Sequence, residues 1–153
     1  MPNKQAISEE FTTLPALSVV MIGFTVFFIL MANTYAAYEN RIEILEKYKT
    51  ADFIATKLTN PDCFFIKEGG IVNIDILKTS ESKEKLNALK DEYKSAGFDF
   101  ILRINWNMSQ EDFPEELAIE IDDRIAVSKD IGVYLNEAQT KPGTLTIILW
   151  SVP

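Results

Sequence analysis

Residues Phe11–Tyr38 read FTTLPALSVVMIGFTVFFILMANTYAAY, and this stretch contains no Asp, Glu, Lys or Arg. A helix of about 20 apolar residues is long enough to cross a bilayer. A helix that is apolar on every side is also difficult to bury in a domain of ordinary size, because only one of its faces can meet a core. The sequence therefore predicts a membrane-spanning helix over residues 11–38, preceded by a short leader over residues 1–10.

The apolar pattern continues past the predicted span with spacings of three and four residues, which indicates an amphipathic extension of the same helix over residues 39–60. Asn60-Pro61-Asp62 should end it, because proline cannot continue a helix. One helix would then serve as both the membrane anchor and the spine of a head. The predicted apolar stripe is Tyr38, Ile42, Leu45, Tyr48, Ala51, Ala55 and Leu58, with charges on the other faces at Glu39, Arg41, Glu43, Glu46, Lys47 and Asp52.

Pro15 leaves two starting points open for this helix. A cap at one of the threonines at positions 12–13 would place Pro15 in the first turn, where its missing N–H costs nothing. A start at Ser8 would make Pro15 an internal residue that kinks the helix. A secretory signal cut near Ala36 is disfavoured, because the apolar stretch is too long and the segment before it too acidic.

The remaining residues, 61–153, predict one β-rich head with an α+β fold. Apolar and polar residues alternate from Phe98 to Trp106, which predicts the clearest strand of the chain. Ser80 or Ser82 should cap a helix, and Gly97 should terminate it. We expect an antiparallel sheet packed on the spine helix.

Further strands and turns follow from shorter patterns. Glu68-Gly69-Gly70 predicts a hairpin between strands at 63–67 and 71–77. The segment 107–114 is interpreted as a polar loop, and Lys141-Pro142-Gly143 as the last turn of the sheet. The remaining predicted strands are Leu117–Ile121, Ile125–Val127, Ile131–Leu135 and Leu145–Val152.

Composition narrows the class of function. The net charge is −8 and the pI is about 4.6, so a polyanionic nucleic acid would be repelled. The chain has no histidine, which removes the usual general base and the commonest zinc ligand. Cys63 is the single cysteine, and we interpret it as a small buried hydrophobe rather than a nucleophile. We expect no enzymatic activity, no catalytic residues and no cofactor.

Two surface motifs allow further hypotheses. Asn107-Met108-Ser109 is an acceptor pattern for N-glycosylation in a head that lies outside the cell. A run of acids could hold a calcium ion, but its spacing does not match a calcium-binding loop, so a solvated acidic edge is the favoured interpretation and no metal site is predicted. The run consists of Glu111, Asp112, Glu115, Glu116, Glu120, Asp122 and Asp123.

The sequence Lys4-Gln5-Ala6-Ile7-Ser8-Glu9-Glu10-Phe11, followed at once by the hydrophobic helix, resembles the class III signal peptide of archaeal type IV pilins and pilin-like proteins. The resemblance covers about the first 60 residues. The usual pattern in that family is Gln, a variable residue, Ser, a variable residue, then Glu. The resemblance implies cleavage by a prepilin peptidase between Gln5 and Ala6, which makes Glu10 the fifth mature residue. Aligning Gln5 with the Gln of the family makes Glu9 the fifth residue instead.

The resemblance further implies a structural subunit, minor or accessory, of a surface filament. Its partners would be membrane lipid, the prepilin peptidase and other pilin-like subunits, but no nucleic acid. Glu10, or Glu9 in the other register, would pair with the N-terminal ammonium of a neighbour, since an unpaired buried charge is costly. The predicted helix contacts are Met21, Phe24, Phe27, Phe28 and Leu30.

The implied location is the cell membrane with the head outside the cell, followed by a surface filament. The alternative is an uncleaved single-span protein whose head binds a ligand or partner. Such a protein would keep Met1 and remain in the membrane.

Overall fold

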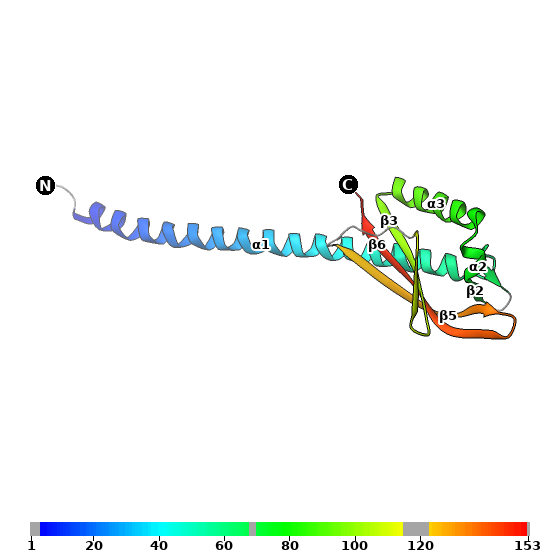
Figure 1. Ribbon diagram of the computed structural model, residues 1–153. Helices are drawn as coiled ribbons and strands as arrows, with labels where there is room; N and C mark the ends of the chain where they lie inside the picture. Colours follow the sequence, from blue (N-terminus) through cyan, green and yellow to red (C-terminus); the bar gives the residue numbers. More distant parts are fainter. Residues whose placement is uncertain (1–3, 68–69, 115–122, 153) are drawn as a thin grey trace. The chain divides into compact units, whose positions relative to one another are not determined.

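The computed structural model describes residues 4–67, 70–114 and 123–152, with side chains from residue 15 onward. The chain divides into two compact units, residues 1–43 and 44–153. The first unit consists of the N-terminal part of helix α1, Lys4–Thr59. The second unit, the head, contains the last turns of α1, a sheet and two further helices (Figure 1).

Helix α1 runs without a break through the predicted span and its predicted extension. It begins at Lys4, so Pro15 is an internal residue and a cap at positions 12–13 is wrong. The helix ends at Thr59, as Asn60-Pro61-Asp62 predicted. The Asn60 side chain accepts a hydrogen bond from the backbone N–H of Asp62 at 3.1 Å, a local turn that competes with further helix.

The described strands of the head form a mixed six-stranded sheet in the order β1-β2-β5-β6-β3-β4. Neighbouring strands are antiparallel, except that β2 and β5 are parallel. The α+β fold with a helix packed on a sheet is thus confirmed, with one parallel pair in place of a wholly antiparallel sheet. The strands are β1 Ile66–Lys67, β2 Ile71–Asn73, β3 Phe98–Trp106, β4 Ser109–Phe113, β5 Arg124–Asn136 and β6 Gln139–Ser151.

The parallel pair follows from what the chain does after β2. The predicted strand over 71–77 is wrong beyond Asn73, because Ile74–Leu77 form a short helix, α2. The Asn73 side chain accepts hydrogen bonds from the backbone N–H groups of Asp75 and Ile76 at 3.0 and 3.3 Å. This cap turns the chain out of the sheet. The long connection through α2, the next helix, β3 and β4 then allows β5 to return parallel to β2.

Helix α3, Ser80–Ser95, follows directly. Its N-cap is Thr79, whose hydroxyl accepts from the Ser82 N–H, rather than Ser80 or Ser82. Gly97 follows the helix with a φ of +86°, a left-handed conformation that favours glycine. Strand β3 then spans Phe98–Trp106, as predicted.

The predicted polar loop over 107–114 is wrong. Asn107 and Met108 have φ values of 41° and 70°, which is typical of the tight two-residue turn of a hairpin. The chain returns as β4, and Trp106 pairs with Ser109. The strand was missed because its residues Ser-Gln-Glu-Asp lack an apolar alternation.

Strands β5 and β6 are the two longest, and they lie side by side (Figure 1). The segments predicted separately at 125–127 and 131–135 belong to one continuous strand, β5. The predicted turn at Lys141-Pro142-Gly143 is wrong, because these residues lie inside β6 and Pro142 pairs with Gly132. The turn lies at 137–138, where the Asn136 side chain accepts from the Ala138 N–H at 3.0 Å. The predicted strand Leu117–Ile121 lies outside the described residues.

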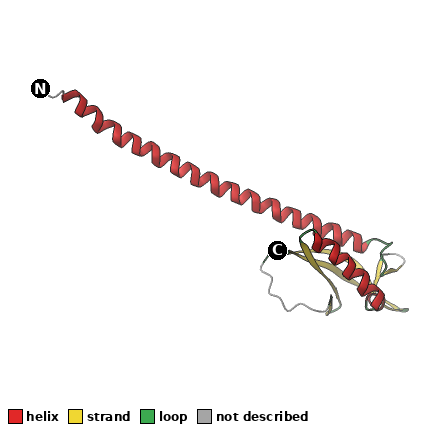
Figure 2. Cartoon of the chain, turned by 90° about the horizontal axis from the view of Figure 1, so that it is seen from above, coloured by secondary structure: helices red, strands yellow, loops and turns green. Residues whose placement is uncertain are grey.

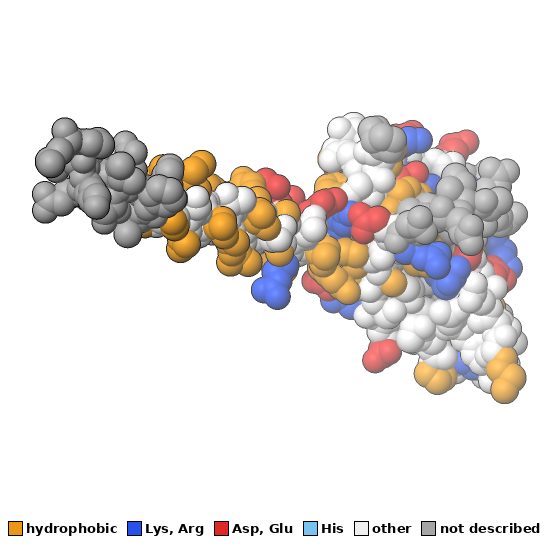
Figure 3. Space-filling view, turned by 90° about the vertical axis from the view of Figure 1, so that its left-hand side faces the viewer, with side chains coloured by type: hydrophobic (Ala, Val, Ile, Leu, Met, Phe, Trp, Pro, Cys, Tyr) orange, Lys and Arg blue, Asp and Glu red, His pale blue; other side chains and the backbone are white. Residues whose placement is uncertain are grey.

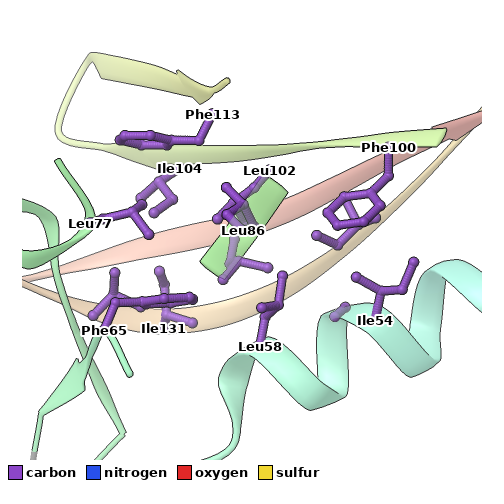
Figure 4. Close-up of a cluster of buried hydrophobic side chains, with 14 of the residues drawn as sticks. Ile54, Leu58, Phe65, Leu77, Leu86, Phe100, Leu102, Ile104, Phe113 and Ile131 are labelled. Carbon is purple, nitrogen blue, oxygen red and sulfur yellow. The ribbon is translucent and has the colours of Figure 1, made fainter. Parts of the chain in front are cut away.

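One face of the sheet, the inner face, is buried beneath the last turns of α1 together with α3, which lie on the same side of it (Figure 2). Figure 4 shows Ile54 and Leu58 of α1 pointing toward the strand residues, with Leu86 of α3 between them. The burial of these apolar side chains stabilises the head. The buried strand residues of this core are Val72, Phe100, Leu102, Ile104, Phe113, Ile131, Val133, Leu145, Ile147 and Leu149.

The helix face that meets the core differs from the predicted stripe. Leu45 and Tyr48 are exposed, whereas Lys47 is buried. The prediction therefore holds only for the C-terminal part of the stripe. The face that is buried in the head consists of Lys47, Ala51, Ile54, Ala55 and Leu58.

Candidate functional site

The candidate site in the first unit is the apolar surface of α1. The described residues contain one helix segment that is long and apolar enough to cross a membrane, within Pro15–Thr59. Its large apolar side chains are exposed on every face, so no protein core in the described chain covers them. Figure 3 shows orange side chains along the helix, and charged side chains both on the part of the helix next to the head and on the head itself. The exposed apolar residues of the span include Leu17, Val20, Met21, Ile22, Phe24, Phe27, Phe28, Leu30 and Met31.

Two hydroxyl groups within this segment are satisfied locally. The Thr25 hydroxyl donates to the backbone oxygen of Met21 at 2.9 Å, and the Thr34 hydroxyl donates to that of Leu30 at 2.8 Å. A hydroxyl that bonds within its own helix can enter a lipid environment without leaving a donor unpaired. The two threonines are therefore compatible with a membrane span.

Aromatic side chains cluster on one part of the helix surface. The ring centroids of Phe24 and Phe28 lie 6.5 Å apart, and those of Phe27 and Phe28 lie 5.9 Å apart. Beside them is an apolar hollow of about 510 Å³, lined by Phe27, Leu30, Met31, Thr34, Tyr35 and Tyr38. The predicted helix-contact residues Met21, Phe24, Phe27, Phe28 and Leu30 are all exposed here, and their contacts with other subunits stay a prediction.

The predicted processing and assembly residues lie in the first turns of α1. The backbone at Gln5, Ala6, Glu9 and Glu10 is helical, and their side chains lie outside the described part of the structure. The cleavage register and the role of either glutamate stay predictions.

Asn107, the predicted glycosylation acceptor, lies at the exposed tip of the β3–β4 hairpin. The neighbouring Met108 is fully exposed. The structure thus places the acceptor pattern in an accessible turn, and modification of the asparagine stays a prediction.

The members of the predicted acidic run that the structure describes, Glu111, Asp112 and Asp123, are held in ion pairs. Lys78 Nζ lies 2.7 Å from a Glu111 oxygen, and the Arg103 guanidinium donates two hydrogen bonds to Asp112 at 2.7 and 2.8 Å. The other members of the predicted acidic run, except Asp123, lie outside the described residues. Among the described residues there is no group of three or more His, Cys, Asp or Glu side chains that could hold a metal ion.

Cys63 follows the end of α1 and is half-buried against the core. Burial raises the pKa of the Cys63 thiol, and hydrogen bonds from the backbone of Phe65 and Phe64 only partly oppose this shift. A raised pKa keeps the thiol protonated near neutral pH, whereas a nucleophilic cysteine needs its thiolate. These properties agree with a packing role.

Two lysines that the sequence reasoning missed attach α1 to strand β5. Lys47 of α1 forms an ion pair with Asp123, directly before β5, and Lys129 of β5 lies 2.5 Å from a carboxylate oxygen of Asp52 on α1. The sequence carried no signal for these pairs, because Lys47 and Asp52 look like ordinary surface charges of an amphipathic helix.

The chain matches no protein-family model, and the comparisons with curated proteins and with solved structures give no match either. The choice of a function therefore rests on the residues of the chain itself.

Proposed function

We propose that the chain is a pilin-like structural subunit of an archaeal surface filament or of its assembly machinery. The observation that carries this proposal is the change of environment along α1. Large apolar side chains of the helix are exposed on all faces through the predicted span, and the same helix enters the hydrophobic core of the head at Ala51–Leu58. Such a helix can reside in a membrane and later pack among copies of itself.

The predicted mechanism is assembly rather than catalysis. The helix would stay in the bilayer until the subunit is extracted, and its apolar surface would then contact neighbouring helices. The head would cover the outside of the filament. A glutamate near the mature N-terminus would set the register by pairing with the terminal ammonium of a neighbour, because a charge buried in an apolar bundle needs a partner.

The alternative is a single-span membrane protein that keeps its leader and presents its head as a binding domain. The helix and head are compatible with both functions. The two functions differ in whether they require Glu9 or Glu10. A helix that serves only as a membrane anchor needs no acidic residue at either position.

The test is to replace Glu10 and Glu9 separately by glutamine in the native host. Filaments sheared from the cell surface are collected, and the subunit is measured in the filament and membrane fractions. The proposal predicts that Glu10→Gln removes the subunit from the filament fraction and leaves its membrane level unchanged. Glu9→Gln is the matched control, and the two outcomes exchange if the other register holds. Normal incorporation of both variants, or no subunit in the filament fraction of the wild type, would contradict the proposal.

A further inference from the structure

A row of four polar side chains crosses the outer face of the sheet, which is the face opposite the core. The strand register pairs Gln110 of β4 with Asn105 of β3, Asn105 with Thr144 of β6, and Thr144 with Asp130 of β5. Residues paired across neighbouring strands project from the same face. With strands about 4.8 Å apart, this row, called here the 105 row, is roughly 14 Å long.

The adjacent row on the same face is internally paired. It consists of Asp112, Arg103, Thr146 and Ser128. Arg103 donates two hydrogen bonds to Asp112, and the hydroxyls of Ser128 and Thr146 lie 2.8 Å apart. Each polar group of that row is therefore occupied by its neighbour.

The 105 row is different. Within the described chain, none of its four side chains makes a hydrogen bond or an ion pair. Two amides, one hydroxyl and one carboxylate thus keep their donors and acceptors open, side by side. Asn105 and Thr144 are half-buried, so their side chains have limited freedom to move away from one another.

The 105 row forms part of the wall of a hollow of about 550 Å³ at the end of the β3–β4 hairpin. Pro142, which pairs with Gly132 on the same face as Thr144, also lines it and adds apolar surface. No lysine or arginine is among the described lining residues, so the hollow is poorly suited to a phosphate or another anion. Asp130 is the single carboxylate in the wall, whereas a hard cation takes several.

We propose that this hollow binds a neutral saccharide. Each sugar hydroxyl is both a donor and an acceptor, which suits a row of amides with a hydroxyl and a carboxylate. The C–H groups of a sugar ring are apolar, which suits the neighbouring ring of Pro142. The 105 row supplies directional hydrogen bonds, and Pro142 supplies apolar contact. This binding site belongs to the head and does not depend on whether the chain enters a filament.

The test uses the full chain, labelled with nitrogen-15, in phosphocholine micelles, since detergents with sugar headgroups would compete. Cellobiose, maltotriose and N,N′-diacetylchitobiose are titrated to tens of millimolar. The proposal predicts that at least one of them causes saturable shifts of backbone amides at 105–110, 130 and 143–144. Thr144→Val should weaken the binding of that saccharide about tenfold, which is the loss expected when one buried hydrogen bond is removed.

Thr146→Val is the matched control, because it makes the same change two residues along the same strand and face, in the row that is already paired. It should leave the affinity unchanged. Gln110→Ala, on the exposed edge strand, gives a second variant that should weaken binding without endangering the fold. The proposal is wrong if no saccharide gives saturable shifts. It is equally wrong if Thr144→Val and Thr146→Val have equal effects, or if inorganic phosphate shifts the same amides as strongly.

Discussion

Lys47 on α1 forms an ion pair with Asp123, directly before β5, and the two side chains differ sharply in environment: 1% of the lysine side chain is exposed, against 72% of the aspartate side chain. The lysine side chain, with its ammonium, is buried in the head, and the carboxylate that it contacts lies at the surface. The pair therefore fixes the point at which α1 enters the head.

This arrangement predicts different outcomes for two replacements of Lys47. Lys47→Ala removes the buried stem as well as the charge and should destabilise the head by about 2 kcal/mol. Lys47→Met keeps the volume and removes the buried charge, so its cost should be below about 1 kcal/mol. Chemical denaturation of both variants in the same micelles measures the difference. Equal losses for the two would show that packing of the stem is unimportant.

Core packing of α1 gives a second prediction. Leu58 is 1% exposed and Phe53 is 62% exposed, although both lie in the same stretch of helix. Leu58→Ala should cost about 3 kcal/mol of unfolding free energy, because it leaves a cavity between α1 and the sheet. Phe53→Ala should cost less than about 0.5 kcal/mol. A loss for Phe53→Ala as large as that for Leu58→Ala would contradict the assigned helix face.

Gly143 in β6 gives a third prediction. A Cβ at this position would lie 2.5 Å from the backbone oxygen of Asn105 and 2.7 Å from Cγ2 of Val133. Backbone cannot yield easily, so Gly143→Ala should destabilise the head by about 1–3 kcal/mol. Gly132→Ala is the matched control, because its nearest contact is a side-chain carbon of Ile71 at 3.3 Å, and it should cost less. The reverse order would overturn the β3–β6 register.

The ion pair between Glu81 and Lys85 in α3 predicts that the stability of the folded state depends on pH. Glu81 accepts a hydrogen bond from Lys85 at 2.6 Å, and this bond, aided by the lysine charge, lowers the pKa of Glu81. A lowered pKa in the folded state means that the pair contributes stability above the usual glutamate value near 4.3. The contribution is lost as the pH falls through the folded-state pKa.

Carbon-13 NMR titration of the Glu81 carboxyl measures this shift. The midpoint should lie below the usual value in the wild type and return toward it in Lys85→Gln, which keeps the length of the side chain and removes its charge. An unchanged midpoint in the variant would show that the pair does not form in solution.

The fold was predictable where hydrophobic patterning and helix stops were clear. The apolar stretch 11–38 predicted α1, and the proline at 61 predicted where it ends. The alternation of Phe98–Trp106 predicted β3. Polar strand β4 and the short helix at 74–77 were missed, because their structure depends on the Asn107 turn and the Asn73 cap rather than on periodicity.

The candidate sites divide in the same way. The membrane helix surface is a property of one continuous segment, so its sequence alone predicted it. The 105 row joins residues of four strands that are distant in the sequence, and their proximity follows only from the strand register. The buried position of Lys47 was likewise unpredictable, because helical spacing placed it among the surface charges.

The central claim, that the chain is a processed subunit of a filament, is tested most directly by the intact mass of the protein. The protein is purified from its native membrane, from cells with and without the prepilin peptidase. We expect the loss of the first five residues only where the peptidase is present, which would leave Ala6 as the N-terminus and Glu10 as the fifth residue. Loss of four residues would assign that place to Glu9. A chain that still begins at or near Met1 in both strains would contradict the filament account and leave a membrane-anchored head.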